Sequence, residues 1–70
     1  MKTEQEIRKQ LEEVTMNYYH VLDCYPATIE INAARALMQI QAIAIINTLY
    51  QVLGEKRPIF KCDDFTKLDH

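Results

Sequence analysis

Twenty-five consecutive residues, from Ile29 to Leu53, are apolar at 17 positions and charged only at Glu30 and Arg35. No Gly or Pro interrupts them, Thr28 precedes them as an N-cap residue, and Gly54 follows as the residue that favours a left-handed helix stop. The sequence therefore predicts one long helix over residues 29–53. A helix that is apolar around its circumference is normally buried on most sides.

The apolar residues of this helix form more than one lengthwise stripe at alternating spacings of four and three residues. The first is Ile31, Arg35, Met38, Ala42, Ile45, Leu49 and Val52, with one polar exception. The second is Ala33, Leu37, Ile40 and Ala44, turning polar at Asn47 and Gln51, and a third side carries Ala36, Ile43 and Tyr50. One neighbouring helix covers one stripe, so the rest forms the kind of apolar patch that marks an interface.

A first helix is predicted over residues 3–24. Thr3 and Glu6 have the spacing of a capping box, and Pro26 ends the helix near Cys24. The core-facing stripe that we predict is Ile7, Leu11, Val14, Tyr18, Val21 and Tyr25. A second strip near the end, Met16, Tyr19 and Leu22, is interpreted as contact with a neighbouring subunit.

Residues 54–70 form a tail in which Pro58-Ile59-Phe60-Lys61-Cys62 is predicted to be extended. Asp63 or Asp64 is expected to cap a last helical turn that holds Phe65 and Leu68. Ile59, Phe60 and Phe65 are expected to pack onto the bundle or onto a partner.

Together these elements predict an all-α single domain over residues 1–70, a helical hairpin over 3–53 with a short tail. A core of this size is marginal, and pairing two hairpins into a four-helix bundle hides the surplus apolar surface. The chain is thus expected to work as a homodimer or higher oligomer. The residues predicted for self-association are Met38, Ile40, Ile43, Ile45, Leu49 and Val52. Those predicted for contact with another protein are Tyr19, Tyr50, Ile59 and Phe60.

Several functions are disfavoured by the sequence. The net charge is −2 and basic residues do not cluster beyond pairs, so no nucleic-acid partner is expected. A helix-turn-helix is disfavoured because the second helix begins with Glu30, Asn32 and Arg35 and is otherwise apolar. Catalytic residues and a cofactor are not predicted, because no nucleophile or phosphate-binding loop stands out. A bound metal is not predicted either, because structural zinc sites usually show two close pairs of ligands and this chain has one. The charged N-terminal segment does not resemble a signal peptide, so a cytoplasmic location is expected.

Two alternatives remain open. His20 and Cys24 lie one helical turn apart, and with Cys62 or His70 they form the basis of a metal- or thiol-dependent sensor. Free thiols are nevertheless expected, because nine residues after Leu53 reach back at most ~30 Å along a helix of ~37 Å.

The uncharged stretch from Ala36 to Gly54 is long enough to cross a bilayer. Its polar residues, Gln39, Gln41, Asn47, Thr48 and Gln51, favour a protein without a membrane span.

The charged, capped opening from Met1 to Glu13 and the closing run Leu49-Tyr50-Gln51-Val52-Leu53-Gly54-Glu55 resemble small helical proteins encoded by bacteriophages and other mobile elements. The resemblance covers about the first 55 residues. It implies a mobile element as the source and identifies no site. In that setting, the expected partner is a host protein that the chain regulates or inhibits.

Overall fold

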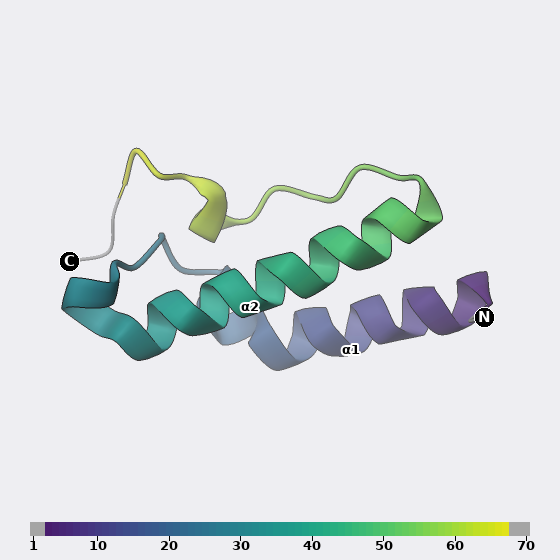
Figure 1. The fold of residues 1–70 in the computed structure, drawn as a ribbon, viewed down its shortest axis with the longest axis horizontal. Helices are drawn as coiled ribbons and strands as arrows, with labels where there is room; N and C mark the ends of the chain where they lie inside the picture. The colour runs from purple at the N-terminus through teal and green to yellow at the C-terminus, as the bar shows by residue number, and fades with distance from the viewer. Residues whose placement is uncertain (1–2, 68–70) are drawn as a thin grey trace.

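The computed structural model describes residues 3–67 and contains two long helices, with bounds close to those predicted (Figure 1). Helix α1 spans Glu4–Leu22 and helix α2 spans Ile29–Leu53. The molecule measures 40 × 20 × 15 Å, and the two helices run antiparallel along its longest dimension. The predicted all-α helical hairpin is confirmed.

Both helices begin at the predicted caps. The backbone amide of Glu6 donates to Thr3 Oγ1 at 3.2 Å, and the amide of Ile31 donates to Thr28 Oγ1 at 3.2 Å. Each threonine thereby satisfies an amide that the first turn leaves without a helical partner. Helix α2 ends at Gly54, whose φ of 72° lies in the left-handed region, as predicted.

Helix α2 is not continuous at its start, although the sequence predicted one unbroken helix. Asn32 has an extended backbone with φ −151° and ψ 83°, and its Oδ1 accepts a hydrogen bond from the amide of Arg35 at 3.1 Å. Asn32 therefore acts as a second N-cap: one capped turn, residues 29–31, precedes the long helix. The physical reason is that a short Asn side chain competes for nearby backbone amides.

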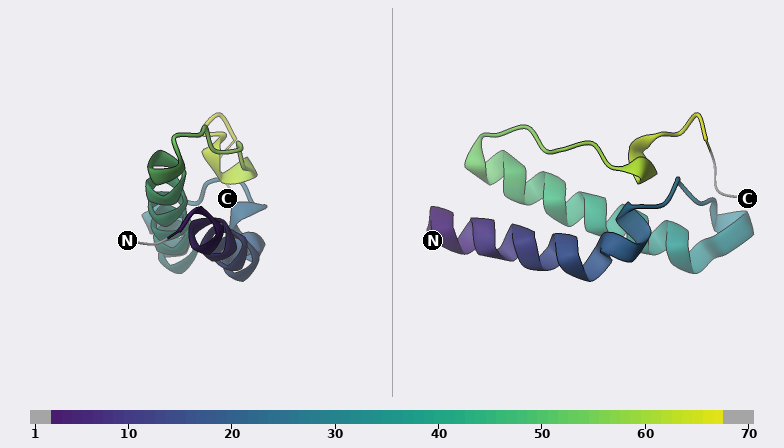
Figure 2. Two further views of the ribbon diagram at one scale, coloured as in Figure 1. Left: turned by 90° about the vertical axis from the view of Figure 1, so that its right-hand side faces the viewer. Right: turned by 180° about the vertical axis from the view of Figure 1, so that it is seen from behind.

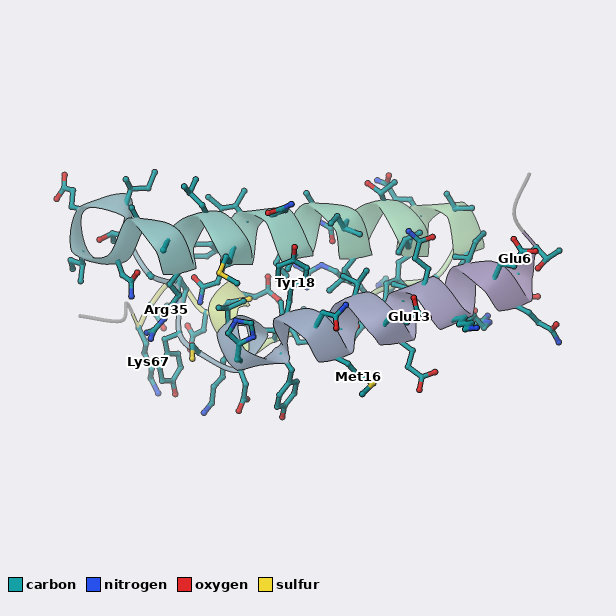
Figure 3. All side chains as sticks on the ribbon, turned by 90° about the horizontal axis from the view of Figure 1, so that it is seen from below. Glu6, Glu13, Met16, Tyr18, Arg35 and Lys67 are labelled. Atoms are coloured by element: carbon teal, nitrogen blue, oxygen red, sulfur yellow. The ribbon has the colours of Figure 1, made fainter. Side chains whose placement is uncertain are left out.

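The core lies between α1, α2 and the tail. Its buried members are Leu11, Leu22, Ala42, Ile46 and Cys62, with Val14, Tyr18, Ile43, Leu49, Tyr50, Leu53 and Phe60 packed around them. Leu11, Val14 and Tyr18 of the predicted α1 stripe face this core, and Figure 3 shows Tyr18 between the two helices. Ile7 and Val21 of the same stripe are buried, whereas Tyr25 lies beyond the end of α1 and is half-buried. Leu22 is completely buried within its own chain, whereas Met16 and Tyr19 are exposed. The predicted subunit contact is thus not needed to explain Leu22.

The tail runs back along α2 and ends near the hairpin connection (Figures 1 and 2). A short 3-10 helix, η1, spans Lys61–Asp63, so the prediction that Lys61 and Cys62 are extended is wrong. The side chain of Asp63 accepts from the amide of Phe60 at 2.9 Å and closes this turn. Phe60 packs on the core as predicted, but Ile59 and Phe65 are 81% and 74% exposed. Leu68 lies outside the described residues.

The tail also reaches the hairpin connection, so the prediction that the residues after Leu53 cannot return that far along α2 is wrong. Lys61 and Lys67 place their Nζ atoms 5.5 and 5.6 Å from the centre of the Tyr25 ring. The tail reaches this point because α2 extends well past the end of α1, and the connection runs outward to meet it (Figure 1). The returning chain therefore has to span only part of α2. Cys24 and Cys62 are nevertheless free thiols.

Candidate interaction surfaces

One lengthwise row of α2 residues is left exposed by both α1 and the tail. We call this row of six exposed residues the outer stripe: Ala33, Leu37, Ile40, Ala44, Asn47 and Gln51. Leu37 is 57% exposed and Ile40 is 62% exposed, although both carry large apolar side chains. Figure 3 shows side chains projecting from α2 on the side opposite α1. The second stripe recognised in the sequence is therefore a solvent-facing surface.

A groove of about 460 Å³ lies beside the outer stripe, between α2 and the tail. Ile40, Ala44 and Asn47 contribute to its α2 side, and Phe65 and Cys62 contribute from the tail. The groove is thus continuous with the outer stripe. Its tail side adds an exposed aromatic ring to the apolar surface of α2.

Gln39 is the buried polar residue of α2 and holds the hairpin connection. Its side chain is only 5% exposed. Its Oε1 accepts from the amide of Ala27 at 3.0 Å, and its Nε2 donates to the carbonyls of Val21 at 3.0 Å, Tyr25 at 3.1 Å and Cys24 at 3.4 Å. One amide side chain therefore satisfies backbone groups of the last turn of α1 and of the connection that follows it. From the sequence, Gln39 was predicted only to interrupt an apolar stretch.

A second polar contact holds the tail in place. The guanidinium of Arg57 donates two hydrogen bonds of 2.7 Å to the two carboxylate oxygens of Asp63, and a third of 3.0 Å to the carbonyl of Pro58. Both charged side chains are largely buried, at 20% and 17% exposed. The hydrogen bonds from Arg57 hold the pKa of Asp63 below its usual value, against the opposing effect of burial. This pair was not predicted from the sequence, because its spacing of six residues is not a helical one.

At the other end of the molecule, Arg8 joins α1 to the start of the tail. Its Nη2 lies 2.7 Å from Glu4 Oε1 and 2.7 Å from Glu55 Oε2. The contact with Glu4 is the expected pairing one helical turn apart. Hydrogen bonding to Arg8 lowers the pKa of Glu55. Because all three side chains are largely exposed, this cluster fixes the tail's starting direction more than it stabilises the fold.

The residues predicted for self-association do not share one surface. Ile40 and Val52 are exposed, whereas Met38 and Ile45 are half-buried. Ile43 and Leu49 pack against the core of their own chain. Of the six predicted residues, only Ile40 therefore belongs to the outer stripe.

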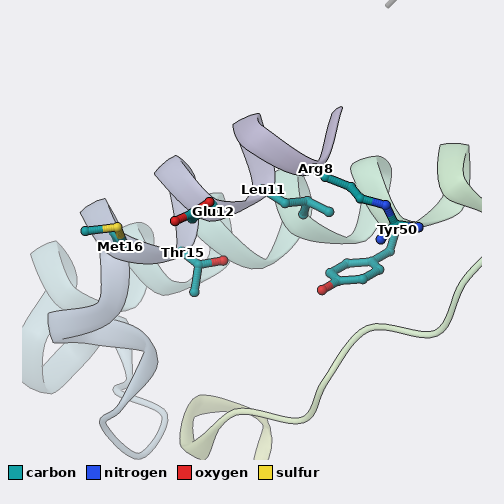
Figure 4. A pocket seen from close by; sticks show the side chains of 6 residues that line it. All are labelled: Arg8, Leu11, Glu12, Thr15, Met16 and Tyr50. Atoms are coloured by element: carbon teal, nitrogen blue, oxygen red, sulfur yellow. The ribbon is translucent and has the colours of Figure 1, made fainter. Parts of the chain in front are cut away.

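The residues predicted for partner contact are also divided. Tyr19 and Ile59 are exposed, while Tyr50 and Phe60 pack against the core. Tyr50 also lines a shallow hollow of about 320 Å³ with Arg8, Leu11, Glu12, Thr15 and Met16 (Figure 4). In that view the Tyr50 ring lies under Arg8, with Met16 at the far end of the hollow. Tyr50 thus combines a core position with a partly accessible ring.

The residues of the metal and thiol alternative are only partly brought together. The Cys24 thiol donates to the backbone carbonyl of His20 at 3.2 Å. Cys62 is buried in the core, and burial raises the pKa of its thiol, which keeps it protonated at neutral pH. Within residues 3–67, no three His, Cys, Asp or Glu side chains are grouped closely enough to hold a metal ion. His70 lies outside the described residues.

By length and composition, α2 is also able to cross a membrane. Its most apolar 18-residue window has a mean hydropathy of 1.4, and 22% of that window is buried inside the chain. The buried core helix of a soluble protein can have the same length and mean hydropathy. The low burial shows how much of α2 its own hairpin leaves uncovered.

No protein-family model, no curated protein sequence and no solved structure matches this chain.

Proposed function

We propose that this chain is a non-enzymatic protein that self-associates through α2 and acts by binding another protein. The observation that carries the proposal is the exposed apolar outer stripe, with Leu37 and Ile40 more than half exposed. Burying a Leu or Ile side chain fully stabilises a protein by about 1.5–3 kcal/mol, so burial of what is exposed here contributes about 1–2 kcal/mol for each residue. Contact with a second protein surface removes this area from water.

The first partner is a second copy, because every copy carries the same uncovered face and pairing hides two such faces at once. Self-association also compensates for the small core of a 70-residue chain. Tyr19 belongs to α1 and Ile59 to the tail, and neither lines the groove beside the outer stripe. Both are exposed, so they are available for a second partner while α2 is occupied. The resemblance to proteins of mobile elements favours a host protein as that second partner, in the cytoplasm.

The experiment that tests this proposal is a measurement of solution mass by light scattering over a range of protein concentrations. A homodimer has a mass of 16.4 kDa, twice the 8.2 kDa of one chain. We expect this mass, or a larger multiple, at micromolar concentrations and above. A stable, folded species of 8.2 kDa at millimolar concentration contradicts the proposal.

Membrane association is the second candidate, and the hydropathy of α2 favours it. Against it stands Gln39, whose side chain is engaged in the hairpin connection and would have to leave that connection if α2 separated from α1 and crossed a bilayer. Co-sedimentation with lipid vesicles separates the two candidates. A self-associating protein remains in the supernatant, whereas a membrane-bound one sediments with the vesicles.

A further inference from the structure

The outer stripe has the residue spacing of a coiled-coil seam. Its six positions follow one another at intervals of four, three, four, three and four residues, and every one of them is exposed. This spacing keeps side chains on one side of a helix and allows them to insert between those of a second helix. The stripe begins after the Asn32 cap, so it lies entirely on the unbroken part of α2.

We propose that the outer stripe is the seam along which α2 pairs in parallel and in register with α2 of a second copy. This inference rests on the proposed self-association and adds the surface and the register that the proposed function leaves open. It also places the seam on a different stripe from the one that the sequence predicted.

The charge of the outer stripe favours a second copy as its occupant. From Ala33 to Gln51 the stripe contains no charged residue, whereas 26% of all residues in the chain are charged. A partner that covers it has to present an uncharged, largely apolar face of similar length. The same stripe on another copy is such a face.

The available area is also in the range that a dimer needs. The stripe is about 27 Å long, and the outer half of a helix 10–12 Å across offers roughly 500 Å² over that length. A standard interface buries about 800 Å² per partner. The adjoining groove contributes the remainder, since Phe65, which is 74% exposed, lines that groove together with residues of α2.

The polar end of the stripe decides between parallel and antiparallel pairing. In parallel register, Asn47 meets Asn47 and Gln51 meets Gln51 of the second copy, and each amide has a donor and an acceptor to offer the other. Leu37 and Ile40 then meet their own counterparts. Antiparallel pairing places Leu37 opposite Asn47 and leaves a buried amide against an apolar side chain, which is unfavourable. A polar residue at one seam position is a known device for fixing register.

The surface is tested with Ile40→Asp and the matched control Ile59→Asp, which introduces the same charge at another exposed isoleucine. Both positions are exposed in the single chain, so both variants are expected to retain their helix content by circular dichroism. We expect Ile40→Asp to give a mass of 8.2 kDa at concentrations where the unmodified chain and Ile59→Asp have at least twice that mass. The milder Ile40→Ala is expected to raise the dimer dissociation constant at least tenfold.

The register is tested with Asn47→Cys in a Cys24→Ser background, using a short bis-maleimide to join two thiols. Parallel pairing predicts a cross-linked dimer for Asn47→Cys and none for the control Met16→Cys, whose position lies on the exposed side of α1. If the unmodified chain is monomeric, the proposed function fails with this inference. If the chain is dimeric but Ile40→Asp leaves the dimer intact, or Asn47→Cys does not cross-link to itself, only the inference is overturned.

Discussion

Replacing Gln39 with Leu tests a buried side chain that makes four hydrogen bonds to the backbone. The change keeps the size of the side chain but removes its hydrogen bonds to Ala27, Val21, Cys24 and Tyr25. A buried backbone group without a partner costs about 1–3 kcal/mol. Ala27 and Tyr25 are half-buried, so water replaces some of what is lost. We therefore expect a loss of about 2–4 kcal/mol in the free energy of unfolding.

That loss is large for a chain of 70 residues, whose total stability at ~0.05–0.15 kcal/mol per residue is about 4–10 kcal/mol. The assay is urea denaturation followed by circular dichroism, at one protein concentration because self-association contributes to the apparent stability. Gln41→Leu is the matched control, because Gln41 lies two residues away and is exposed. Its effect is expected to stay within about 0.5 kcal/mol. Equal stabilities of the two variants would refute the role assigned to Gln39.

A Gln39→Glu variant adds a dependence on pH to the same test. The carboxylate still accepts from the Ala27 amide, but it brings negative charge towards the carbonyls of Val21 and Tyr25, so the pKa of the new carboxyl is raised in the folded state. A raised folded pKa gives stability that is present at low pH and is lost as the pH rises through that pKa. We expect the variant, compared with the unmodified chain, to be more stable in mild acid than at neutral pH. A pH-independent difference would contradict this account.

Three further predictions concern the tail and the end of α2. Asp63→Asn is expected to destabilise the chain by about 1–3 kcal/mol at pH 7. Because the pKa of Asp63 is lowered, its ion pair with Arg57 stabilises the fold at pH values above the ordinary Asp pKa. The difference in free energy of unfolding between the variant and the unmodified chain should therefore vanish as acid protonates Asp63. Urea titrations at neutral and acidic pH measure this difference. Gly54→Ala is expected to lower the stability measured by thermal unfolding by about 1 kcal/mol, because a residue with a side chain is strained at a φ of 72°. Crowding is not the cause, since no atom lies within 4 Å of the added carbon. Gly54→Asn should cost less, and equal losses for the two variants would contradict this reason. Labelling with iodoacetamide, followed by mass spectrometry, is expected to modify Cys62 far more slowly than Cys24 until urea unfolds the chain. The reason is that Cys62 is buried and the pKa of its thiol is raised. Equal labelling rates in the native state would show that the tail does not pack on the helices.

Local signals in the sequence predicted the elements of the fold well. Thr3, Thr28 and Gly54 act within one turn of the residues they cap, so each is readable without knowledge of the tertiary structure. The stripe of α1 is equally readable, because its polar opposite side leaves one apolar face. Asn32 was missed because a mid-helix asparagine caps a helix only when the preceding turn leaves the helical path.

The packing face of α2 could not be predicted from the sequence, because α2 has several apolar faces where α1 has one. When 17 of 25 residues are apolar, several stripes satisfy the same spacing, and periodicity does not choose among them. Ile46 is completely buried but belongs to none of the stripes recognised in the sequence, while Ile40 is exposed. The contacts of Gln39 and the Arg57–Asp63 pair depend on how the connection and the tail return, which is tertiary information.

Protection of the outer stripe from water in solution is the most direct test of the central claim. Methyl NMR with a soluble paramagnetic probe measures this for Leu37 and Ile40, with Ile59 as the exposed reference on the same chain. We expect weak broadening of the Leu37 and Ile40 methyl signals and strong broadening of the Ile59 signal at concentrations where the chain is assembled. Equal broadening at all three positions would show that nothing covers α2 and would contradict the account.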